Sequence, residues 1–178
     1  MKGGIVMKDK SLEKKNRELV IKKLSELLMP YGFVKTKPTF YTRLHKDRIE
    51  FIHLHKFTFA PSFRVHIGIR FLIDNLDFVA LNGIEANGYK NEYPINYNFR
   101  YHKDDNSIVR CANQILLFVE NEAPPWLDIW RDQDTLFTRQ DSPLREELVH
   151  QYKLFKDETN NNDLVLITQS KKLLGIKQ

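Results

Sequence analysis

The chain has one cysteine, no long apolar segment and no stretch that resembles a secretion signal. The single thiol, Cys111, excludes an internal disulfide. Residues 115–119 are among the longest purely apolar stretches, and they supply a quarter of the roughly 20 residues that cross a bilayer. Residues 1–9 carry lysines and glycines but no apolar run able to act as a signal. We therefore expect a cytoplasmic protein without a membrane partner.

The chain also lacks the motifs that usually identify an enzyme. No glycine-rich phosphate loop follows a predicted strand, and no serine lies in a nucleophile elbow. Cys111 falls on the apolar side of a predicted helix, where a thiol packs as a small hydrophobic group. The sequence therefore predicts neither a cofactor nor a catalytic residue.

Positive charge is concentrated at the start of the chain. Residues 1–48 contain 13 Lys or Arg and 5 Asp or Glu, a net charge of +8, whereas residues 49–178 carry −3. Such an asymmetry can attract an acidic protein or a phosphate backbone, although lysines spread over a solvated helix give the same count.

Three successive antiparallel strands are predicted in the first half of the chain. In residues 63–71 apolar and polar side chains alternate almost without fault. One face of this strand therefore lies against a core, and the other carries Arg64, His66 and Arg70. Two more strands precede it and are joined by short polar turns, at residues 33–44 and 49–59.

The rest of the chain is predicted to be mainly helical. Apolar residues at helical spacing indicate helices over 11–29 and from residue 105 to just before Pro124. Two further helices are expected to begin at Ser142 and Asp163, and a further strand, at an edge because of Pro94, over 93–101. We predict a single α+β domain at 11–178, preceded by a disordered leader at 1–10. Its N-terminal and C-terminal helices pack on one face of a largely antiparallel sheet of about four or five strands.

Several segments together resemble a known family. They include Tyr31-Gly32-Phe33 after an amphipathic helix, the strands at 40–43, 51–56 and 63–69, and the segments 108–122, 125–127 and 134–137. This combination, over roughly residues 12–150, is similar to the bacterial family termed domain of unknown function 4304. The resemblance implies a small bacterial α+β protein, and it transfers no catalytic residue because the family has no assigned activity.

Two histidines on one predicted strand raise the question of a metal site. His53 and His55 are two residues apart, so their rings project to the same side, about 7 Å apart along the backbone. His66 is the obvious third ligand, but it lies on the opposite side of the sheet if Phe51 and Val65 both line the core. We therefore predict no metal site.

The polar side of the sheet is the candidate binding surface. The predicted ligand-binding residues are Arg43, His53, His55, Arg64, His66 and Arg70. The lead interpretation is a protein-interaction module without catalysis, whose open sheet face recognises a partner protein. The tyrosines of residues 93–101 and the pair Trp126 and Trp130 support it, because such side chains are enriched at interfaces, although at helical spacing they also seal cores.

Two other interpretations use the same residues. In the alternative, the protein binds nucleic acid through these arginines and histidines and through the lysines and arginine of the first helix, at Lys14, Lys15, Arg17, Lys22 and Lys23. In the third, a histidine-based or metal-dependent enzyme holds an anionic substrate on the same face while one histidine transfers a proton.

Overall fold

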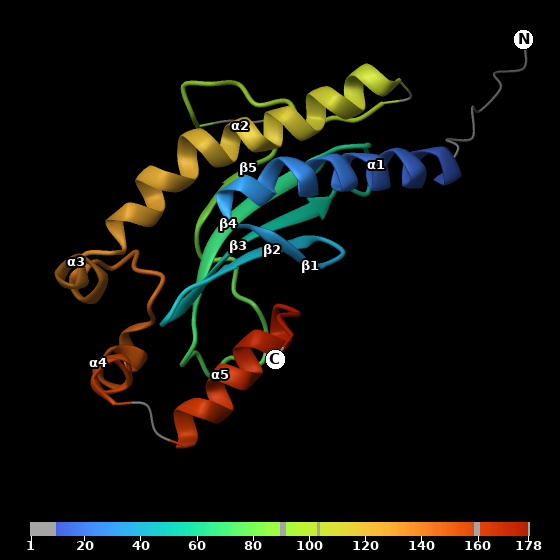
Figure 1. Cartoon of the computed structure of the whole chain (residues 1–178). Helices are drawn as coiled ribbons and strands as arrows, with labels where there is room; N and C mark the ends of the chain where they lie inside the picture. Colours follow the sequence, from blue (N-terminus) through green and yellow to red (C-terminus); the bar gives the residue numbers. More distant parts are fainter. Residues whose placement is uncertain (1–9, 90–91, 103, 159–160, 178) are drawn as a thin grey trace, which may run out of the picture.

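The computed structural model describes residues 10–89, 92–102, 104–158 and 161–177. Of the predicted leader at 1–10, only Lys10 lies within this range, as the first residue of a helix. Five antiparallel strands form one sheet, and neighbours in the chain are neighbours in the sheet (Figure 1). They are β1 (Val34–Lys37), β2 (Phe40–Leu44), β3 (Arg48–Lys56), β4 (Phe63–Phe71) and β5 (Ile84–Ala86). The prediction of an α+β domain with a largely antiparallel sheet is confirmed.

The longest helices cover one side of the sheet, here called the first face. The helices are α1 (Lys10–Leu28), α2 (Asp105–Ile129), α3 (Gln133–Thr138), α4 (Val149–Asp157) and α5 (Asn161–Leu173), with short 3-10 turns η1 (Met29–Tyr31) and η2 (Glu146–Leu148). α1 and α2 lie side by side on the first face (Figure 1). The Tyr41 hydroxyl of β2 donates to the carbonyl of Ile21 in α1 at 2.9 Å. Val65 and Ile67 of β4 are fully buried in this core, as their alternation predicts.

On the opposite side of the sheet, the second face, a helix covers one end and leaves the other end uncovered. α5 lies there (Figure 1), and its Ser170 hydroxyl bonds with Arg70 of β4 and with the Leu72 carbonyl. The second face is apolar at this end, since Ile49 and Phe51 are fully buried. Burying these side chains stabilises the fold, so a second layer forms here. α5 therefore lies across the sheet from α1 and α2 rather than beside them.

Residues 33–44 form a hairpin rather than the single strand predicted. Lys37 pairs with Phe40, so Pro38 and Thr39 are the two residues of the turn between β1 and β2. Pro38 has no amide hydrogen to donate to a ladder, and a turn is a position where none is needed.

The prediction of a strand at 93–101 is wrong, although its burial pattern holds from Tyr97 onward; Ile95 is exposed. Tyr97, Phe99 and Tyr101 are buried against the core, and Asn98 and Arg100 between them are exposed. Among the described residues of this segment, Arg100 alone forms a bridge, to Ser62. Alternation reports one buried side of an extended chain, which does not require a ladder of hydrogen bonds.

α2 continues through two prolines at which the sequence predicts its end. Pro124 and Pro125 lie inside the helix, and Trp126 and Trp130 follow on the same element or at its C-terminal cap. A proline removes one helical hydrogen bond and crowds the preceding turn. The buried stripe nevertheless continues through Ala123 and Leu127 to Trp130, and we infer that this packing offsets the cost.

Candidate ligand-binding surface

Three histidines meet on the second face at the end that α5 leaves uncovered. His53 of β3 is the direct cross-strand partner of His66 of β4, and their ring centroids are 5.8 Å apart. His55 lies 6.4 Å from His53, and Phe40 of β2 stacks on His53 at 4.3 Å. This part of the second face is called the open half below.

The prediction that His66 lies across the sheet from His53 and His55 is therefore wrong. It assumed that Phe51 and Val65 bury against the same core. Both are fully buried, but Phe51 points to the second face and Val65 to the first. Both sides of the sheet have buried apolar residues, so burial alone does not identify a side.

The two paired histidines are neutral near pH 7. Burial, followed by the nearby His66 and His55, lowers the pKa of His53 to about 4. Burial, with Arg64 and His55, lowers the pKa of His66 to about 4 as well. The His66 Nδ1 lies 3.2 Å from a carboxylate oxygen of Glu85 on β5, but that side chain is half exposed and its attraction is weakened by water. Neutral rings can stack and hydrogen-bond without carrying charge.

Exposed aromatic rings and arginines continue the open half beyond the histidines. Phe57, Phe59 and Tyr89 contact one another, with ring centroids 5.0 to 5.9 Å apart. The Arg64 guanidinium lies 5.5 Å from the Phe57 ring centre, and that of Arg100 lies 4.4 Å from the Tyr89 ring centre. Phe59 is 64% exposed and Tyr89 44% exposed. Two large rings are thus held by neighbours while their outer surfaces face water.

Two polar atoms on the open half have no hydrogen-bond partner among the described residues. They are Nδ1 of His53 and Nε of Arg64, and both are shielded from water. A buried polar atom without a partner costs free energy. Similar atoms occur elsewhere in the described residues, among them Nε1 of Trp130 and Nε of Arg145, so these two atoms do not by themselves mark a binding site.

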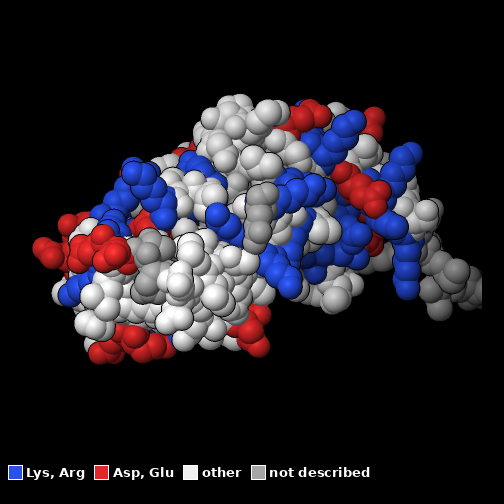
Figure 2. Space-filling view, turned by 60° about the horizontal axis from the view of Figure 1, so that its bottom comes forward, with Lys and Arg blue, Asp and Glu red and all other residues white. Residues whose placement is uncertain are grey.

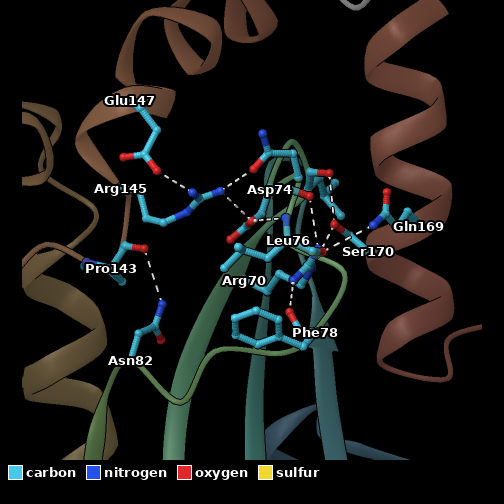
Figure 3. A network of polar contacts seen from close by, with 12 residues as sticks. Arg70, Asp74, Leu76, Phe78, Asn82, Pro143, Arg145, Glu147, Gln169 and Ser170 are labelled. Carbon is cyan, nitrogen blue, oxygen red and sulfur yellow. Dashed lines mark hydrogen bonds and ion pairs between the residues drawn. The ribbon is translucent and has the colours of Figure 1, made fainter.

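Arg70 does not belong to this surface, although the sequence assigned it there. It is 2% exposed, and its guanidinium donates to the carbonyl oxygens of Asp74, Leu76 and Phe78 at 2.8 to 3.0 Å (Figure 3). Its Nε donates to the Ser170 hydroxyl of α5 at 2.9 Å. Arg70 therefore ties the loop after β4 to the C-terminal helix, and it is unavailable to a ligand.

Arg43 is also separate from the open half. Its neighbour in the ladder is Glu50, and the two side chains form an ion pair at 2.6 Å on the first face. The guanidinium lies 4.6 Å from the Phe33 ring centre and donates to the Tyr31 carbonyl. The structure thus brings together four of the six predicted residues, at His53, His55, Arg64 and His66.

The aromatic residues that suggested a protein interface are largely internal. Tyr97, Phe99 and Tyr101 pack in the core, and Trp130 is 1% exposed. Cys111 is also buried, with its pKa raised by burial, as packing rather than reactivity requires. Within the described ranges, no group of three potential metal-ligating side chains is close enough to hold an ion.

The residues of the open half that sequence reasoning missed come from distant segments. Phe57 has the same strand parity as His53 and His55, which could have identified it. Tyr89 and Arg100 lie in irregular segments whose position next to Phe59 has no local sequence signal.

The basic surface of α1 lies at the same end of the molecule as the open half. Lys56 ends β3 next to His55, and its Nζ lies 2.6 Å from a carboxylate oxygen of Glu13 in α1. Figure 2 shows Lys and Arg side chains gathered over the centre and right of that view, on the side of α1 and the strand ends, with a mostly uncharged region below them. The basic helix on the first face and the His/Arg surface on the second face therefore share this end of the sheet, with the sheet between them.

Comparison with known proteins gives no further identification: no family model, no curated protein and no solved structure matches the chain. Among the described residues, no helix is long and apolar enough to cross a membrane.

Proposed function

We propose that the protein binds single-stranded nucleic acid, without catalysis, through the open half of the second face. The observation that carries the proposal is the pair of exposed rings, Phe59 and Tyr89, which both contact the buried Phe57 ring, with Arg64 over Phe57 and Arg100 over Tyr89. Unpaired bases stack on aromatic rings, while guanidinium groups contact phosphates or stack on bases. Duplex DNA keeps its bases stacked internally and cannot use such rings.

The charge distribution favours nucleic acid over a protein partner. The basic residues of α1 lie at the same end of the sheet as the open half, on the other face, and a phosphate backbone is attracted by such a concentration of cations. A protein partner was suggested mainly by Trp130 and by the tyrosines of residues 93–101, which are largely buried. Phe59 and Tyr89 would suit a protein interface too, so a failure of all oligonucleotides to bind would favour a protein ligand.

The histidines support binding rather than proton transfer. A general acid or base works best when its pKa is near the working pH. The pKa values of His53 and His66 are about 4, so both rings stay neutral at pH 7. The neutral His53 and His66 rings stack on each other, and Phe40 stacks on His53, so that the three rings form an uncharged floor for this part of the surface.

The test is a fluorescence anisotropy titration with labelled 20-nucleotide DNA and RNA, single-stranded and duplex, at 50 to 200 mM salt. We expect single strands to bind more tightly than duplex, and affinity to fall steeply as salt rises. Tyr89→Ala and Phe59→Ala should each weaken binding by about 5- to 150-fold, since stacking of one base contributes about 1–3 kcal/mol.

Phe78→Ala is the matched control. Phe78 is 56% exposed but lies in the loop beside α5, away from the open half. Its substitution should leave oligonucleotide affinity unchanged. No binding of any oligonucleotide at 50 mM salt would refute the proposal and return the protein-partner interpretation to first place.

A further inference from the structure

We propose that the groove between α1 and the β1–β2 hairpin is a phosphate-binding site. If the proposed function holds, a nucleic-acid strand bound on the open half continues round the end of the sheet and places its phosphate backbone in this groove. The groove has a volume of about 800 Å³. Its lining includes four cationic side chains from three elements, namely Arg17, Lys22, Lys35 and Lys56.

Most of these cations are not neutralised by the protein. Lys56 is paired with Glu13. Arg17, Lys22 and Lys35 have no carboxylate within 4.0 Å in the described part of the chain. Glu18 and Glu26 also line the groove, but neither pairs with one of its cations. The positive charge is therefore available to a ligand.

The shape of the groove suits an extended anion. Ile21, Phe63 and Pro38 supply apolar surface, and the cations stand on both walls, on α1 and on the strands. Cations on opposite walls can contact successive phosphates of one chain, whereas a single anion needs only one of them. Lowered water access beside the apolar residues strengthens such contacts.

The groove and the open half lie on opposite faces of the sheet, at the same end of its strands. Successive strand residues point to opposite faces, so His55 faces the open half and Lys56 lines the groove. The β1–β2 turn makes the same division, because Pro38 and Thr39 line the groove while Phe40 stacks on His53. A bound strand would pass round the end of the sheet, where β3 ends at Lys56, to reach one site from the other.

The experiment removes charge from the groove and measures the salt dependence of binding. Lys22→Gln/Lys35→Gln should reduce the slope of log K against log salt for a single-stranded 20-mer by about 1.4, because each lost phosphate contact is worth about 0.7. Tyr89→Ala should weaken binding and leave the slope unchanged. Lys46→Gln/Lys153→Gln is the charge-matched control, with Lys46 in the turn at the opposite end of β2 and β3 and Lys153 on α4.

A second arm uses inorganic tripolyphosphate alone, titrated by calorimetry. We expect it to bind the wild type and the control variant, and not Lys22→Gln/Lys35→Gln. If tripolyphosphate behaves so while no oligonucleotide binds, the proposed function falls and the phosphate site stands. If the double variant retains both the wild-type salt slope and the wild-type tripolyphosphate titration, the groove is not a phosphate site, whatever the aromatic variants do. Circular dichroism melting checks that each variant is folded.

Discussion

The two ends of the second sheet face differ in what lies on them, and one strand shows the contrast. Arg64 and Arg70 both lie on β4 and point to the same side. Arg70 is buried by α5 and the loop after the strand, and it donates to four acceptors. Arg64 has an unpartnered Nε among described residues, and its guanidinium lies over the Phe57 ring. Identical residues in identical strand positions thus serve structure at one end and, in our proposal, binding at the other.

The element that covers a polar residue, rather than the strand that carries it, decides the role of that residue. α5 lies about a hundred residues beyond β4 in the chain, and the Arg70 and Ser170 side chains meet through tertiary packing (Figure 3). At the uncovered end no helix supplies such a partner, and the Nε of Arg64 has none among the described residues.

The largest expected effect is the loss of stability on removing Arg70. Arg70→Met should lower the free energy of unfolding by about 3 kcal/mol or more, because buried acceptors lose a charged donor. Urea denaturation measures this value. Arg64→Met is the matched variant on the same strand, and it should change stability by less than about 0.5 kcal/mol. An equal loss of unfolding free energy in the two variants would show that α5 does not make Arg70 structurally different from Arg64.

The next effect tests how closely the covered end is packed. Gly68 lies on β4 between the two arginines, and a Cβ built on it would lie 2.4 Å from the Phe51 ring. Gly68→Ala should therefore destabilise the fold by about 2 kcal/mol through overpacking. The smaller side chain in Gly68→Ala/Phe51→Leu relieves that contact, so the alanine should cost less in the Phe51→Leu background. A thermal or urea melt in which it costs the same in both backgrounds would contradict this account.

The smallest effect concerns the open half and depends on pH. In the unfolded chain histidine titrates near 6.5, whereas the pKa of His53 and His66 in the folded protein is about 4. Between these values the unfolded state binds more protons, so stability falls as the pH drops from about 6.5 towards 4. Because the site is partly exposed, we expect a loss of only about 1 kcal/mol.

Urea unfolding at pH 7, 6 and 5 measures this dependence. His53→Gln/His66→Gln should flatten it, while His150→Gln, at an exposed position on α4, should not. A wild type whose stability stays constant over this range would show that the histidines are not held neutral by burial.

Local patterns predicted much of the fold but only part of the surface. The alternation in β4 and the apolar stripes of α1 and α2 appear in the structure because each reports a buried side. The hairpin at Pro38 and the unpaired segment 93–101 were missed, since alternation does not report hydrogen-bond partners. Parity grouped His53 with His55 on one strand and Arg64 with His66 on the next, but only the register of β3 against β4 put the two groups on one side. The join with Tyr89 and Arg100 depends on irregular segments.

The sequence by itself determined the central strands, the main helices and the side of the strand on which each polar residue of β4 lies, because these follow from the period of side chains along a local backbone. Only the tertiary structure decided that His66 stands beside His53, that Arg70 is internal and that the basic helix lies at the same end of the sheet as the open half. These relations depend on which distant segment covers each part of the sheet. Such coverage is set by the packing of whole elements, and no local period encodes it.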